Sequence, residues 1–121
     1  MQTPLQLTFR NMAHSDALAA HLEQRTEKLE RLSDRIVSCH VVVELVGHHQ
    51  HHGERYRFSI HLGLPEHELL VTRAPSQHRD LENAFVMADR AFDEAERQLE
   101  DWAKRQRERR HEVARVDAGR S

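Results

Sequence analysis

The chain has 121 residues, which is the length of one domain and leaves no room for two. Apolar residues make up 38% of it, aromatic residues 5% and charged residues 31%, a polar composition that still allows a modest core. There is no run of 18 apolar residues, which excludes a membrane-spanning helix, and the first residues lack the pattern of a signal peptide. Cys39 is the single cysteine, so no internal disulfide can form. We therefore expect a soluble cytoplasmic domain.

Charge is unevenly distributed along the chain. The formal net charge is −2 with neutral histidines. Residues 103–121 hold seven cations and three anions, a charge of +4, so residues 1–102 carry −6. A chain of this balance has no overall basic footprint for nucleic acid, and any such function must depend on local surfaces.

The first half of the chain alternates strand and helix patterns. Leu5, Leu7 and Phe9 alternate with polar residues, which predicts a half-buried strand. Ser15 precedes a segment with apolar residues at helical spacing, so we expect it to cap a helix over roughly 16–35. The β-branched segment 36–46 predicts a second strand.

The second half continues with strands and ends in a long helix. The segment 47–53 (GHHQHHG) predicts a hairpin turn, and alternation from Arg55 to Leu62 predicts a third strand. A turn at 65–68 precedes a short strand over 69–72. A helix is expected to begin near 76–80, with a stripe of residues spaced by four and three positions: Leu81, Phe85, Ala88, Phe92, Ala95, Leu99 and Trp102.

These elements predict an α+β fold of order β-α-β-β-β-α, with two helices packed on one face of a four-stranded sheet, similar to a double-stranded RNA-binding domain. We expect the domain to cover residues 1–106. Because the apolar stripe fades after Trp102, we expect a basic tail over 107–121 that is either frayed helix or disordered.

The cations of the two helices allow two interpretations. On the long helix Arg79, Arg90, Arg97 and Lys104 share the face opposite the stripe, where pairs such as Asp93–Arg97 and Glu100–Lys104 would suit a simply solvated surface. On the first helix, Lys28, Arg31 and Arg35 form a basic flank. Arg25 occupies a stripe position where leucine is expected, so it must reach solvent, pair with an anion, or line a phosphate-binding groove between the helices.

Four histidines in the predicted turn, His48, His49, His51 and His52, are weak candidates for a metal site. Zinc needs three or four ligands held in tetrahedral geometry, which a turn between glycines does not supply, so we predict no metal site and no cofactor. The sequence also lacks an H-E-x-x-H pattern, a glycine-rich phosphate loop and a nucleophile with an evident base. It indicates no enzyme and no small-molecule substrate.

Three motifs in this order resemble the ribosome hibernation promoting factor and ribosome-associated translation inhibitor family. They are Arg25-Thr-Glu-Lys28-Leu-Glu-Arg31 on the first helix, His78-Arg-Asp-Leu81-Glu-Asn-Ala84 at the entry to the second, and Glu96-Arg97-Gln98-Leu99 within it. The resemblance covers residues 4–106 and is to the short form of the family, without a second, dimerising domain. It departs from the family pattern at Glu94 and Asp101, where better-known members tend to carry lysine.

The resemblance implies a non-enzymatic stress protein that binds the small ribosomal subunit and its ribosomal RNA in the decoding channel, blocks tRNA and mRNA, and inhibits translation. The implied RNA-binding residues combine the family's basic positions with the basic faces described above: Arg25, Lys28, Arg31, Arg35, Arg90, Arg97, Lys104, Arg105, Arg10 and Arg73. Two alternatives on the same fold stay open, a histidine-rich metal- or stress-responsive protein and a generic double-stranded RNA binder.

Overall fold

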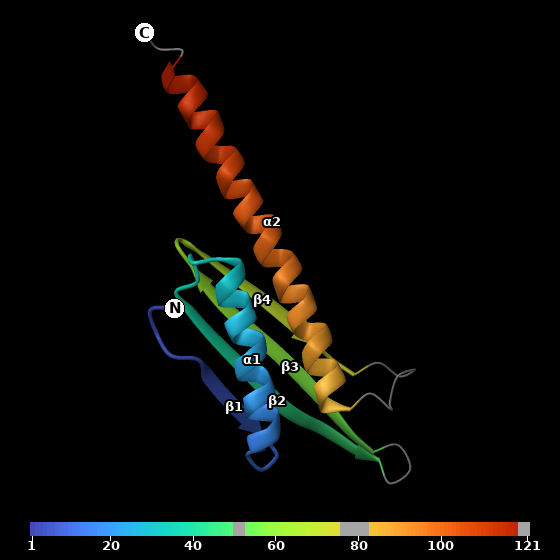
Figure 1. The fold of residues 1–121 in the computed structure, drawn as a ribbon. Coiled ribbons are helices and arrows are strands. Elements are labelled where there is room, and N and C mark those ends of the chain that lie inside the picture. Colours follow the sequence, from blue (N-terminus) through green and yellow to red (C-terminus); the bar gives the residue numbers. More distant parts are fainter. Residues whose placement is uncertain (50–52, 76–82, 119–121) are drawn as a thin grey trace.

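The computed structural model describes residues 1–49, 53–75 and 83–118, which form one sheet covered on one face by two helices (Figure 1). The sheet order is β1-β2-β3-β4, with β1 parallel to β2 and the other pairs antiparallel. The elements in chain order are β1 (Gln6–Arg10), α1 (Asp16–Leu32), β2 (Ser38–His49), β3 (Gly53–Leu64), β4 (His67–Arg73) and α2 (Ala84–Ala118). The predicted α+β architecture is confirmed.

Helix α1 begins as predicted and ends earlier. The Ser15 hydroxyl accepts a hydrogen bond from the backbone N–H of Leu18 at 3.2 Å, which caps the first turn. The helix stops at Leu32 and not near residue 35, because Ser33 is extended, with φ of −156°. The Ser33 hydroxyl accepts from the backbone N–H of Arg35 at 3.2 Å, a local bond that competes with further helix.

The β2–β3 hairpin is longer than predicted. Strand β2 continues to His49 and β3 begins at Gly53, with His48 opposite Glu54 and His49 opposite Gly53. The expected turn over 47–53 is therefore wrong at both ends, because backbone pairing continues past a register shift between Leu45 and Gly47. Residues 50–52 lie outside the described part. The next turn is also tighter than expected, since only Pro65 and Glu66 separate β3 from β4.

Helix α2 differs from prediction at both ends. It begins at Ala84, where the Asn83 side-chain oxygen accepts from the Val86 N–H at 2.9 Å, and not near 76–80; residues 76–82 lie outside the described part. It continues to Ala118, so residues 107–118 of the expected tail are helical and not disordered. This segment contains no glycine or proline and is rich in Arg, Glu and Ala, which are strong helix formers.

The core lies between the sheet and the two helices, which run side by side (Figure 1). Leu22 and Leu29 of α1, Phe58 and Ile60 of β3, and Phe92 of α2 are fully buried there. Beyond Trp102 the helix α2 leaves the sheet and projects outward (Figure 1). None of the described helices is long and apolar enough to cross a membrane.

Candidate nucleic-acid interface

Arg25 is bound by three carboxylates of the neighbouring helix. Its Nη1 donates to Asp89 Oδ1 at 2.7 Å, and its Nη2 donates to Asp93 Oδ1 at 2.8 Å and to Glu96 Oε2 at 3.1 Å. The side chain is only 14% exposed, and its guanidinium lies 5.6 Å from the centre of the Phe92 ring. Of the three possibilities that the sequence allowed, Arg25 pairs with anions.

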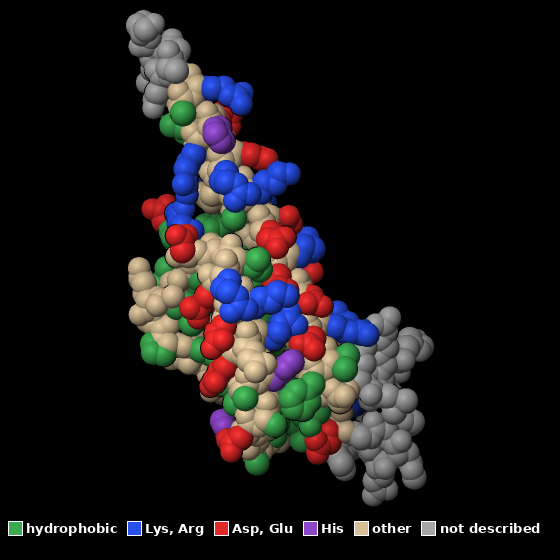
Figure 2. Space-filling model, viewed as in Figure 1, with side chains coloured by type: hydrophobic (Ala, Val, Ile, Leu, Met, Phe, Trp, Pro, Cys, Tyr) green, Lys and Arg blue, Asp and Glu red, His purple; other side chains and the backbone are tan. Residues whose placement is uncertain are grey.

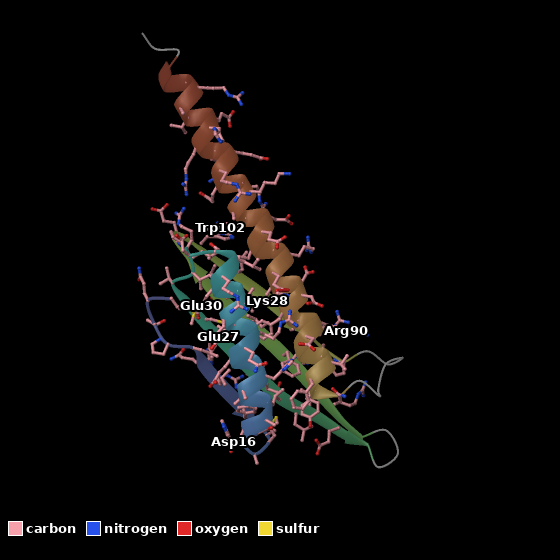
Figure 3. All side chains as sticks on the ribbon, in the orientation of Figure 1. Asp16, Glu27, Lys28, Glu30, Arg90 and Trp102 are labelled. Carbon is pink, nitrogen blue, oxygen red and sulfur yellow. The ribbon has the colours of Figure 1, made fainter. Side chains whose placement is uncertain are left out.

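Two further side chains of α1 join this cluster, which we call the helix seam: His21, Arg25, Lys28, Asp89, Asp93 and Glu96. Lys28 Nζ lies 3.1 Å from Glu96 Oε1, and Lys28 extends from α1 toward α2 in Figure 3. His21 Nε2 lies 2.7 Å from Asp89 Oδ1. With His21 neutral, three carboxylates face two cations, so the helix seam has one net negative charge.

The helix seam also changes the acidity of one of its carboxyls. Partial burial raises the pKa of Asp89, but hydrogen bonds from His21 and Arg25 outweigh that effect and hold the pKa below its usual value. Asp89 is therefore ionised across the neutral range and binds the cations of α1. These cations already have anionic partners within the protein.

Arg97 is paired as well, on the exposed face of α2. It donates to Glu94 at 2.5 Å and 3.0 Å and to Asp101 at 3.2 Å. Hydrogen bonds from Arg97 and Gln98 lower the pKa of Glu94 to about 2. The pairs expected from the sequence are wrong in detail: Asp93 binds Arg25, and no Glu100–Lys104 pair forms within the described residues.

A second set of cations has no such partners. One groove is lined by Arg31 in the last turn of α1, by Arg35 in the turn that follows α1, and by Arg107 and Arg110 of α2, together with Trp102 and Gln106. We call it the arginine groove. None of these four arginines forms an ion pair within the described residues. The Arg35 guanidinium lies 5.7 Å from the centre of the buried Trp102 ring. In Figure 3, Trp102 marks the place where α2 passes the end of α1.

The arginine groove is positively charged. Glu30 and Asp34 are the acidic residues of its lining, so four arginines face two carboxylates and two positive charges remain. Figure 2 shows Lys and Arg mixed with Asp and Glu over the helix pair, and more Lys and Arg than Asp and Glu where α2 projects. Lys104 and Arg105 also lie exposed on this part of α2.

The structure separates the remaining predicted residues from the arginine groove. Arg10 is exposed at the end of β1, where its register partner on β2 is Glu44. Arg73 and Arg90 line a separate groove between β4 and α2, together with Arg97. The predicted residues thus do not form one surface.

Arg107 and Arg110 were missed from the sequence because both fell in the tail segment, which was expected to be frayed helix or disordered. The spacing does indicate that they lie near Trp102. On a continued helix, Gln106 and Arg110 follow Trp102 by about one and two turns, and Arg107 is next to Gln106. The histidine prediction stays untested. His51 and His52 lie outside the described residues, and elsewhere in the described chain no group of three or more His, Cys, Asp or Glu is placed to hold a metal ion.

Comparison with known proteins identifies relatives. Residues 5–107 match the family model described as Sigma 54 modulation protein / S30EA ribosomal protein. The fold is similar to the N-terminal domain of Thermus thermophilus Protein Y, with 24% identity, a TM-score of 0.63 and coverage of 80% of this chain and 94% of that one.

It is also similar to a ribosomal subunit interface protein from Coxiella burnetii, with 17% identity, a TM-score of 0.64 and coverage of 83% and 97%. No curated protein sequence matches significantly. The family match spans all four strands, α1, and α2 as far as residue 107, and it confirms the resemblance that the three motifs indicated. The chain belongs to the Sigma 54 modulation protein / S30EA ribosomal protein family.

Proposed function

We propose that this protein binds the small ribosomal subunit in the decoding channel, where it excludes tRNA and mRNA and inhibits translation in idle ribosomes. The observation that carries the proposal is the family match, which covers residues 5–107 and so nearly the whole folded unit. The description of that family names a ribosomal protein, and the Coxiella burnetii relative is named a ribosomal subunit interface protein. A ribosomal partner makes the cytoplasm the place of action.

The charge distribution supports an RNA ligand. Although the chain has a net charge of −2, arginines that have no carboxylate partner among the described residues gather where α1 ends and on the projecting part of α2. Arginine suits RNA because its planar guanidinium can donate two parallel hydrogen bonds to one phosphate. A local basic surface on an acidic domain favours one orientation on the RNA, since the rest of the domain is repelled.

No enzymatic step is part of the proposal. Binding and steric exclusion are sufficient for inhibition, and the residues discussed above supply charge and hydrogen-bond donors. Arg25, Lys28 and Arg97 remain proposed RNA contacts from the family resemblance, but each would have to exchange a carboxylate for a phosphate. Arg31, Arg35, Lys104 and Arg105 would not, so we rank them first.

Cosedimentation with purified small subunits, large subunits and whole ribosomes tests the function. We expect the protein to sediment with small subunits and whole ribosomes, to be displaced by initiator tRNA with mRNA, and to inhibit translation in a purified system. Affinity should fall steeply with salt, because each neutralised phosphate releases counterions. Equal binding to an isolated RNA duplex would instead identify a generic double-stranded RNA binder, and failure to sediment at low salt would exclude ribosome binding.

A further inference from the structure

The arginine groove is built from two parts of the chain that meet only in the folded protein. Arg31 lies in the last turn of α1 and Arg35 in the turn that follows it, whereas Arg107 and Arg110 come from the part of α2 that continues past the sheet. The helix up to Ala118 keeps Arg107 and Arg110 on adjacent turns of one face. Four guanidinium groups therefore line one groove from two sides.

Like charges gathered in this way repel each other unless an anion joins them. The acidic lining residues, Glu30 and Asp34, do not pair with these arginines; the ion pair that Glu30 makes is with the N-terminal amine, at 3.8 Å. In the free protein the charge of Arg31 is partly stabilised, since a cation in the last turn of α1 interacts favourably with the helix dipole. Arg107 and Arg110 lie before the last turn of α2, so the helix dipole does not stabilise their charges in this way.

The chemistry of the lining fits phosphate better than other anions. Several guanidinium groups can bind a chain of phosphates by paired hydrogen bonds, and the amide of Gln106 adds donors and acceptors for sugar hydroxyls. Trp102 is almost fully buried, so its ring packs against the Arg35 guanidinium and is not available to stack on a base. The groove is therefore suited to a phosphate backbone and not to base recognition.

We propose that the arginine groove binds consecutive phosphates of an RNA backbone, with Arg107 and Arg110 as contacts that act together with Arg31 and Arg35. Its biological ligand rests on the ribosome binding proposed above. The projecting part of α2 is thus a functional half of the RNA site and not a dispensable extension.

Two matched double charge reversals on α2 test the proposal. Arg107→Glu with Arg110→Glu alters the groove, whereas Arg109→Glu with Arg115→Glu makes the same charge change on exposed positions outside it. Glutamate suits a helix, so circular dichroism should show the same helix content for both. We expect the groove variant to bind small subunits about 100-fold more weakly, from roughly tenfold per lost charged contact, and the control to change by less than about threefold. Equal losses in both variants would overturn the proposal.

A conservative variant and a free RNA ligand complete the test. Arg107→Gln with Arg110→Gln should reduce the slope of log affinity against log salt by about 1.4, since about 0.7 is expected per single-strand phosphate contact; an unchanged slope would contradict phosphate binding. A short single-stranded RNA should bind the wild type and lose binding in the groove variant. That result would support RNA binding by the arginine groove even if the protein bound no ribosomal particle. Failure to bind ribosomal particles would then count only against the proposed function.

Inorganic tripolyphosphate distinguishes RNA from free phosphate chains. At constant ionic strength it should compete with the RNA for the wild-type protein, because both present linked phosphates, but RNA should bind more tightly through its additional phosphates. No competition would overturn phosphate recognition. Tight binding of tripolyphosphate with no binding of RNA would identify a free oligophosphate as the ligand and overturn the assignment to RNA.

Discussion

The helix seam and the arginine groove lie on the same pair of helices and use the same side chain in opposite ways. In the helix seam, Arg25 contacts three carboxylates and is 14% exposed. In the arginine groove, Arg107 and Arg110 are exposed and unpaired within the described residues. The difference lies in the residues of α2 that are nearby. Asp89, Asp93 and Glu96 lie beside the middle of α1, whereas Arg107 and Arg110 lie beside the end of α1.

The comparison teaches that an arginine on a helix is not by itself an RNA contact. An ion pair within the protein must be broken before phosphate can bind, whereas an unpaired arginine loses only water and counterions. The helix seam should therefore control stability, and the arginine groove should control binding. The following predictions test this division from the largest expected effect to the smallest.

Charge reversal at Arg25 should be the most damaging change. Arg25→Glu would place a fourth carboxylate among Asp89, Asp93 and Glu96, and we expect a loss of roughly 2–3 kcal/mol in the free energy of unfolding, less than for a fully buried pair because Asp93 is exposed. Urea unfolding measures this value. The matched control Arg107→Glu, on an exposed position before the last turn of α2, should change stability by less than about 0.5 kcal/mol. Equal stability changes would show that the helix seam is not a stabilising contact.

Acid should weaken the carboxylate pairs selectively. The pKa of Glu94 is about 2 against an ordinary value of 4.5, and that of Asp89 is also lowered. Since the folded-state pKa values are depressed, the stability that these groups contribute is present above about pH 4.5 and is lost as pH falls toward 2. Thermal unfolding between pH 7 and pH 2.5 should show this decline. The decline should be shallower in Glu94→Gln than in the wild type and unchanged in Arg107→Gln. If Glu94→Gln declines in parallel with the wild type, the ion pairs of Glu94 do not contribute to stability.

Removing one carboxylate should release Arg25 toward RNA. Asp93→Asn keeps the shape of the side chain and lowers the negative charge of the helix seam, so ribosome affinity should rise by about two- to fivefold. Stability should fall by no more than about 1 kcal/mol, because Asp93 is mostly exposed. Glu23→Gln, on an exposed position of α1 outside the helix seam, is the control of equal charge change. An equal gain in the control would mean that only net charge matters.

Arg97 gives the smallest expected effect and the sharpest test of the rule. It is exposed like the groove arginines, yet it is paired with Glu94 and Asp101 like Arg25. If pairing limits availability, Arg97→Gln should lower ribosome affinity by no more than about twofold, with only a small decrease in the melting temperature because both of its ion pairs are exposed. A tenfold loss of affinity, measured by cosedimentation, would show that a paired arginine still contacts RNA and would break the division between the two regions.

Most of the architecture was predictable because it depends on local patterns. The strands β1 and β3 follow from alternation, and the buried face of α2 follows from the helical spacing of Phe92, Leu99 and Trp102. The start of α1 follows from the Ser15 cap. The errors lie at boundaries. Ser33 ended α1 through a side-chain hydrogen bond, and backbone pairing carried β2 to His49. A hydrophobic pattern does not report either of these polar interactions.

The candidate site was only half predictable. Its basic residues on α1 could be named from the sequence, and so could the anomaly of Arg25 within an apolar stripe. From the stripe alone, leucine at that position would be expected to preserve or raise stability. The structure predicts the opposite, since removing Arg25 would take away the cation that Asp89, Asp93 and Glu96 of α2 share.

The sequence by itself determined the fold class, the family and the types of charge on each helix, because periodicity, caps and motifs are properties of consecutive residues. Only the tertiary structure decided which cations are neutralised. Arg25 and Asp89 are 64 positions apart, and Arg31 and Arg107 share a groove only because α2 packs beside α1 and continues past the sheet. Electrostatic energy depends on distance in space, so the same arginine can stabilise the fold or remain open to RNA according to what the packing places beside it.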